Sequence, residues 1–338
     1  MGKLAERLRI DPYILAILAT VGIAALIPAR GSGATVASHA TTIAVGLLFF
    51  LYGARLSPRA ALEGARHWQL HTVVFAATFV LFPLLGLALR VLRPDVLTPE
   101  LYTGVLFLCL LPSTVQSSIA FTSIAKGDVA AAICSASFSN LIGIILTPLL
   151  VAGLIHGAGS AGFSGSSVLD IVLELLVPFI AGQLLRPWIA DWVTRHKKIL
   201  GLVDKGSILL VVYTAFSEGV VAGIWHQLSV SRLFLLIGVN MVLLAVVLCC
   251  TAFAATRLGF NREARITIIF CGSKKSLASG LPMATVLFAG GNVGLIVLPL
   301  MLFHQIQLIT CAALARRWAR TAPPEPVTAE PAAATPSR

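Results

Sequence analysis

The chain carries little charge for its length. Only 12% of its 338 residues are Asp, Glu, Lys or Arg, whereas 57% are hydrophobic. Soluble domains have about twice that share of charged residues. Their core helices also do not need apolar stretches as long as those found here. The composition therefore argues against a soluble protein and predicts a membrane protein.

Enzyme, metal and nucleic-acid motifs are missing as well. The chain has no HExxH, GxSxG, Walker or paired-carboxylate motif, which argues against an enzyme. The six cysteines lie in apolar stretches without CxxC spacing, so we interpret them as reduced packing residues and expect no metal or cofactor. The net charge of +11 is not interleaved with aromatic residues, so no nucleic-acid partner is expected.

About ten apolar stretches follow one another, and we interpret each as a membrane-spanning helix. They cover residues 12–28, 40–55, 69–89, 101–125, 129–155, 169–189, 206–224, 233–256, 264–288 and 293–315. The sequence thus predicts an all-α polytopic membrane protein with ten transmembrane helices.

Lysine and arginine are distributed unevenly between alternate loops, and in short loops such residues stay on the cytoplasmic side. One set of loops and termini contains eighteen of them and the other contains four. The first set is Lys3, Arg7, Arg9, Arg55, Arg59, Arg66, Lys126, Arg186, Arg195, Lys197, Lys198, Lys205, Arg257, Arg262, Arg265, Arg316, Arg317 and Arg320. The second set is Arg30, Arg90, Arg93 and Arg232. We therefore expect an even number of spans, both termini in the cytoplasm and a location in the bacterial inner membrane.

The first five and last five stretches form an internal repeat with an offset of roughly 160 residues. Because five is odd, the second copy enters the membrane with the opposite orientation, which makes a 5+5 inverted repeat. The predicted parts are a cytoplasmic N-terminus (1–11), the first repeat (12–155), an extracytoplasmic linker (156–168), the second repeat (169–316) and a disordered cytoplasmic tail (317–338).

The fourth and ninth stretches contain helix-breaking residues at matching positions. Pro112 is followed by Ser113 and Thr114, and Gly272 is followed by Ser273. Proline removes a backbone donor. Backbone groups freed at membrane depth are tolerated only where they are buried in protein or line a cavity. One proline kink is usually structural, but two breaks in an inverted repeat indicate the binding site of a secondary transporter.

Lys274 and Lys275 follow the second break, between apolar runs that are each too short to span a bilayer. A lysine at that depth costs about 3 kcal/mol even on the mildest insertion scale and is seldom kept without a task. The two side chains point about 100° apart on a helix. One could face a cavity while the other binds carbonyls at a half-helix end, and the sequence leaves open which. The other candidate residues of the two breaks are Gln116, Ser117, Ser118, Ser273 and Ser276.

These residues resemble the bile acid:sodium symporter family over about residues 10–320. GSKKSLASG (Gly272–Gly280) is similar to the signature of the branch that includes the seventh human member of solute carrier family 10. Further matches are AKGDVAAAI (125–133), LTP (146–148), Asn240 and the pair His304 and Gln305. The resemblance implies a core of spans three to five and eight to ten, crossed by the two broken helices. A panel of spans one, two, six and seven would move against this core.

The resemblance also allows a prediction about sodium binding, because the family's cation ligands lie where the two broken helices cross. A glutamate of the family falls on Phe270, a glutamine falls on Thr78, and a glutamine and an asparagine fall on the two lysines. The family's pair in span four falls near Ser117 and Ser118. Its hydroxyls in span five fall on Ala132 and Ala136, with Ser135, Ser137 and Asn140 nearby but not in register. Sodium a few ångströms from an ammonium is repelled by several kcal/mol at an effective dielectric constant of about 20. We therefore expect degenerate sodium sites and a coupling ion that is a proton or none.

A lysine at the crossover could act as a built-in cation, titrate as a buried amine or neutralise an anionic substrate. Glu218 is a candidate proton carrier or lysine partner, with a near-surface structural role as the alternative. His304 is more typical of a packed, hydrogen-bonded histidine than of a proton relay.

The favoured interpretation is a secondary active transporter of a small organic anion that works by alternating access. Two alternatives stay open. One is a non-transporting membrane regulator of ion or lipid homeostasis. The other is an arsenite-type efflux carrier, which would need a reactive cysteine at the crossover. The identity of the substrate and the oligomeric state do not follow from the sequence.

Overall fold

The computed structural model describes residues 12–55, 67–94, 96–156, 165–221, 223, 229–289 and 291–321. This part of the chain is helical and contains no β-strand. Six of its helices are long and apolar enough to cross a membrane, and a bent pair of shorter helices makes a seventh if the pair is one span. The prediction of an all-helical, multi-pass membrane protein is confirmed. The predicted N-terminal segment, most of the linker and the tail beyond residue 321 lie outside the described residues.

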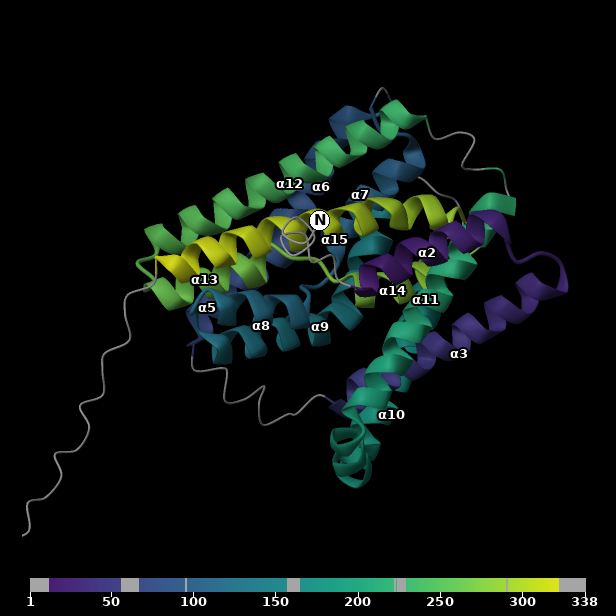
Figure 1. The fold of residues 1–338 in the computed structure, drawn as a ribbon, viewed down its shortest axis with the longest axis horizontal. Coiled ribbons are helices and arrows are strands. Elements are labelled where there is room, and N and C mark those ends of the chain that lie inside the picture. Colours follow the sequence, from purple (N-terminus) through teal and green to yellow (C-terminus); the bar gives the residue numbers. More distant parts are fainter. Residues whose placement is uncertain are drawn as a thin grey trace, which may run out of the picture.

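Figure 1 shows the arrangement of the helices. In chain order they are α2 (Pro12–Leu26), α3 (Ser32–Arg55), α5 (Trp68–Ala76), the π-helix η2 (Ala77–Leu81), α6 (Phe82–Ala88), the 3₁₀-helix η3 (Leu89–Leu92), α7 (Pro99–Leu110), α8 (Val115–Ile124), α9 (Val129–Val151), the π-helix η4 (Ala152–His156), α10 (Gly165–Arg195), α11 (Lys197–Val221), α12 (Val230–Arg257), α13 (Arg262–Gly272), α14 (Leu277–Leu287) and α15 (Val293–Arg320).

Several helices are longer than the apolar stretches that predicted them. The helix expected from residue 40 begins at Ser32, and α15 continues to Arg320, four residues into the predicted tail. Apolar composition marks the part of a helix that lies in lipid. The backbone hydrogen bonds continue through the small, hydroxyl and basic residues that flank that part.

Helices α2, α3, α10 and α11 pack together, and we call this group the panel (Figure 1). Two glycines bring α3 and α10 into close contact. A Cβ atom on Gly53 would clash with the carbonyl oxygen of Phe179, and one on Gly182 would clash with that of Phe50. Small residues at a crossing let two helix backbones approach closely, which is the usual way to hold helices together inside a membrane.

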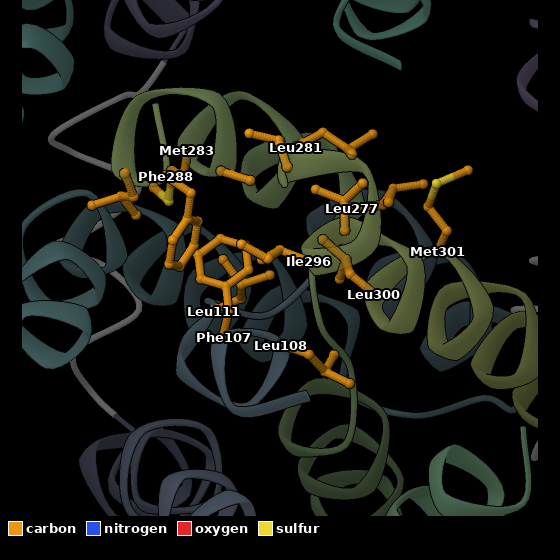
Figure 2. Packing of buried hydrophobic residues seen from close by; sticks show 14 of the residues in the cluster. Phe107, Leu108, Leu111, Leu277, Leu281, Met283, Phe288, Ile296, Leu300 and Met301 are labelled. Carbon is orange, nitrogen blue, oxygen red and sulfur yellow. The ribbon is translucent and has the colours of Figure 1, made fainter. Parts of the chain in front are cut away.

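The remaining helices form the second group, the core, in which α7, α14 and α15 share an apolar centre (Figure 2). The rings of Phe107 on α7 and Phe288 after α14 meet edge to face with centroids 5.1 Å apart. Gly104 on α7 has no room for a side chain, because a Cβ atom there would clash with the carbonyl oxygen of Ile296 on α15. This packing fixes α7 and α14, and both helices adjoin the breaks that the sequence predicts.

Candidate functional site

The first break separates α7 from α8, which are bent by 61° relative to each other. Leu111 has an extended backbone with ψ of 155°, and Pro112 has no N–H to continue the helix. The ring of Pro112 rests on α9 at Gly143, where a Cβ atom would lie 2.7 Å from it. The α7–α8 break is therefore built into the packing between two elements.

The second break separates α13, which ends at Gly272, from α14, which begins at Leu277. Ser276 caps the new helix, because its hydroxyl accepts a hydrogen bond from the backbone N–H of Ser279 at 3.2 Å. Both helix breaks predicted from Pro112 and Gly272 are thus present.

The two breaks contact each other through hydrogen bonds between backbone and hydroxyl groups. The N–H of Ser276 donates to the carbonyl of Pro112 at 2.9 Å. The hydroxyl of Ser113 donates to the carbonyl of Cys271 at 2.6 Å, and that of Thr114 donates to the carbonyl of Lys275 at 2.7 Å. Each broken helix therefore satisfies polar groups that the other leaves without a helical partner.

Lys275 is fully buried at this crossover and is held at both ends. Its Nζ atom donates to three backbone carbonyls, those of Thr78 at 2.8 Å, Cys109 at 2.9 Å and Leu111 at 2.7 Å. Its own backbone N–H and carbonyl both bond to the amide of Gln307 at 2.9 Å. The interpretation of one lysine as a ligand of carbonyls at a half-helix end fits Lys275.

Lys274 is equally buried but has a different environment. Its Nζ atom donates to the carbonyl of Ser117 at 2.8 Å and lies over the ring of Phe121 at 4.0 Å and that of Phe270 at 5.2 Å. The Ser117 hydroxyl is buried and has no hydrogen-bond partner among the residues that the structure describes. Aromatic faces attract cations through their quadrupole, so the rings stabilise this ammonium.

A cavity of about 530 Å³ lies beside the crossover, between the panel and the core. The core contributes the starts of α8 and α14 and one face of α9, and the panel contributes parts of α3, α10 and α11. The polar core residues that line it are Thr114, Gln116, Ser137, Asn140, Ser276 and Ser279. Neither crossover lysine is among the lining residues.

Residues 11–320 match the model of the SBF-like CPA transporter family. The chain belongs to this family. It is 57% identical to PA2026 of Pseudomonas aeruginosa and 53% identical to "Putative symporter YfeH" of Escherichia coli, in each case over 92% of this chain and 93% of the relative. It is 30% identical to "Sodium/bile acid cotransporter 7" of Xenopus tropicalis over 93% of both chains.

Membership of this family makes the protein a membrane transporter and not an enzyme, as the sequence predicts. It also confirms the resemblance to the bile acid:sodium symporters. A transporter of this family has a small organic substrate and a membrane environment.

Within this SBF-like transporter, the predicted site residues fall into two sets. The first set lies at the crossover or the cavity: Thr78, Gln116, Ser117, Ser118, Asn140, Ser273, Lys274, Lys275 and Ser276. The second set lies away from the cavity lining: Ser135, Asn240, Glu218, His304 and Gln305.

Members of the second set have other contacts. Ser135 bonds His71 at 2.6 Å, and Asn240 donates to the carbonyl of Pro299 at 3.3 Å. Glu218 is exposed on α11. It is not the partner of either lysine, because the ammonium groups of Lys274 and Lys275 bond backbone carbonyls. His304 bonds the Gln307 amide at 2.8 Å, as expected of a packed, hydrogen-bonded histidine.

Three groups of residues at the crossover and the cavity are not predicted from the sequence. Gln307 lies on α15, three residues after His304, and its side-chain amide bonds the backbone of Lys275. Ser139 accepts the N–H of Ser113 at 3.0 Å. The panel side of the cavity carried no local signal, because its residues are apolar or belong to loops already explained by topology. In the sequence, the cavity is indicated only by the polar residues that follow the breaks and by Asn140, which the family resemblance adds.

Proposed function

We propose that the protein is a secondary active transporter that moves a small organic anion by alternating access, with the cavity as its substrate site. The proposal includes ten spans in a 5+5 inverted repeat, both termini in the cytoplasm and a location in the bacterial inner membrane. The charge asymmetry of the loops and the Escherichia coli and Pseudomonas aeruginosa relatives support this placement.

The observation that carries the proposal is the pair of helix N-termini at the cavity. Thr114, Val115 and Gln116 bring the start of α8 to its wall, and Ser276 and Ser279 bring the start of α14. Thr114, the N-cap residue of α8, makes no capping hydrogen bond, since its hydroxyl donates to the carbonyl of Lys275 instead. A helix N-terminus carries about half a positive charge and unpaired N–H groups. Discontinuous helices of transporters point such ends at anionic substrate groups.

The panel side of the cavity favours the same substrate class. Arg55 and Lys205 line it, and the one acidic lining residue, Asp204, forms an ion pair with Arg55. Phe49 on α3 and Phe179 on α10 add an apolar wall. A carboxylate or sulfate bound near the crossover would thus place its hydrocarbon part against the panel. The relatives named as bile acid cotransporters fit this description.

Alternating access requires that the panel and the core move against each other. A hydrogen bond of 3.4 Å joins them at the cavity, from the Tyr52 hydroxyl on α3 to the carbonyl of Ala278 on α14. The cavity reaches Arg55 and Lys205, which belong to the loops assigned to the cytoplasm. The described state is therefore the inward-facing one in this proposal.

Two glycines of α11 provide a matched test of the cavity. Gly201 lines it and Gly206 does not, and a Cβ atom on either would meet no other atom within 4 Å. Gly201→Trp should fill the cavity without disturbing the helix, because Trp is a better helix former than Gly. Gly206→Trp should leave the cavity open.

The measurement is a thermal-shift screen with bile salts, steroid sulfates and mono- and dicarboxylates, followed by uptake of the stabilising anion into proteoliposomes. We expect an anion that stabilises wild-type protein while its neutral methyl ester or alcohol does not. Gly201→Trp should weaken its binding by about tenfold or more, equivalent to about 1.4 kcal/mol. Equal binding by the Gly201→Trp and Gly206→Trp variants would contradict the assignment of the cavity.

A further inference from the structure

Three backbone carbonyls at the crossover have lost their helical partners, each for a local reason. The first belongs to Thr78 in the π-helix η2. The N–H of Phe82 donates to the carbonyl of Ala77, one residue earlier than in an α-helix. The next residue, Pro83, has no N–H. The carbonyl of Thr78 is therefore left to another donor.

The other two carbonyls belong to the end of α7. In a continuous helix the N–H of Ser113 would bond the carbonyl of Cys109, but it donates to the hydroxyl of Ser139 instead. Leu111 lies past the end of the helix in an extended conformation, so its carbonyl has no helical partner either. The end of α7 also carries about half a negative charge. The carbonyl oxygens of Cys109 and Leu111 and the partial negative charge at the end of α7 therefore converge on one position.

The ammonium of Lys275 occupies that point. Its three protons match three acceptors at 2.7–2.9 Å, and no other hydrogen-bond capacity is left on the group. The ring of Phe82 covers it at 4.1 Å, and the side chain is completely buried. A compact cation bound by convergent carbonyl oxygens is how proteins bind a monovalent ion that has shed its water.

We propose that the carbonyls of Thr78, Cys109 and Leu111 form a monovalent-cation site, which the protein fills with its own Lys275 and which binds a free ammonium or potassium ion once that side chain is truncated. The ligands are neutral carbonyls with no carboxylate, so the site suits a single charge rather than a calcium or magnesium ion. The inference goes beyond the proposed function, since it concerns the integrity of the crossover and requires no substrate.

Lys274 provides the matched control, because it is the adjacent residue, has the same charge and is equally buried. It has one carbonyl acceptor, that of Ser117, and otherwise faces the rings of Phe121 and Phe270. Truncating it opens no group of three convergent carbonyls. A small cation should therefore not replace its ammonium.

The experiment measures melting temperatures in detergent for wild-type protein and for Lys275→Ala, Lys275→Met and Lys274→Ala. The variants are purified in ammonium chloride and exchanged into choline chloride. Ammonium or potassium chloride is then titrated at constant ionic strength. The choline ion is too large for the site and serves as the inert cation.

We expect the melting temperature of Lys275→Ala to be lowest in choline and to rise with ammonium or potassium until it saturates, as binding to the folded state requires. Wild-type protein should not respond, since its site is filled. Lys275→Met should be destabilised without rescue, because its side chain occupies the space. Lys274→Ala should be destabilised without rescue as well.

A Lys275→Ala variant that does not respond to ammonium, or that cannot be recovered folded in it, would overturn the proposal. An equal response of Lys274→Ala would do the same, because the effect would then be a general one of salt. The readout contains no organic anion. A failure here therefore leaves the substrate assignment standing, and a failed anion screen leaves this site standing.

Discussion

The two crossover lysines meet the same physical problem in different ways. A buried ammonium without partners costs far more than a membrane protein can tolerate. Lys275 is satisfied by three carbonyls, whereas Lys274 has one carbonyl and two aromatic rings. Lys274 and Lys275 could be predicted as site residues from the sequence, because placing a lysine at membrane depth costs free energy. The division of roles between the two lysines could not be predicted, because their partners come from separate elements: η2 and the end of α7 for Lys275, and α8 and α13 for Lys274.

Gln307 gives the first prediction at the residue scale. Its amide is buried and bonds both the N–H and the carbonyl of Lys275. Gln307→Leu should lower the melting temperature, because it leaves the buried N–H of Lys275 unpaired at a cost of about 1–3 kcal/mol, whereas the carbonyl keeps the hydroxyl of Thr114. Gln305→Leu is the control, since Gln305 lies two residues away on α15 and is only half-buried. Equal melting temperatures for the two variants would show that Gln307 does not hold the crossover.

At the scale of elements, the sequence predicts where helices break better than where they begin. Proline and glycine act locally, so Pro112 and Gly272 marked both breaks correctly. The π-helix at Ala77–Leu81 was not predicted, since a wider turn is set by packing against neighbours. Here Gly272 packs on Ala77, and a Cβ atom on Gly272 would lie 3.2 Å from that residue.

The contact between α3 and α10 gives a prediction at the same scale. Gly182→Ala would drive a methyl group into the backbone of α3 at Phe50, and backbone cannot give way as a side chain can. We expect a loss of about 1–3 kcal/mol in stability, as for other overpacked sites. Gly46→Ala on α3 should be neutral or gain up to about 1 kcal/mol, because a Cβ atom there meets nothing within 4 Å.

Thermal unfolding of the two alanine variants in detergent checks this. If the Gly182→Ala and Gly46→Ala variants have equal melting temperatures, the panel does not depend on the glycine contact between α3 and α10.

At the scale of the whole molecule, the cavity could be predicted only from one side. Gln116 and Ser276 are predicted from the two breaks and Asn140 from the family resemblance, and all three line the cavity. The opposite wall comes from α3, α10 and α11, whose residues give no sign of function in the sequence. Their contribution depends on how the panel packs against the core, and that packing is a property of the tertiary fold.

The charge of the crossover leads to the last prediction, which concerns ion coupling by the transporter. The core holds two ammonium groups at the crossover, and Phe270, whose ring lies 5.2 Å from Lys274 Nζ, provides no balancing carboxylate. A sodium ion 4 Å from one ammonium would be repelled by about 4 kcal/mol at an effective dielectric constant of 20. That is about a thousandfold in its binding constant.

We therefore expect anion uptake into proteoliposomes to proceed equally when choline replaces sodium on both sides of the membrane. The anion is the one identified by the thermal-shift screen, and empty liposomes are the control. A steep dependence of uptake on sodium would contradict this prediction, because a sodium ion would then have to bind despite both lysines or at a distance from them. Sodium-independent uptake would leave the two modes expected from the sequence, a proton as the coupling ion or no coupling ion, and the pH dependence of uptake would distinguish them.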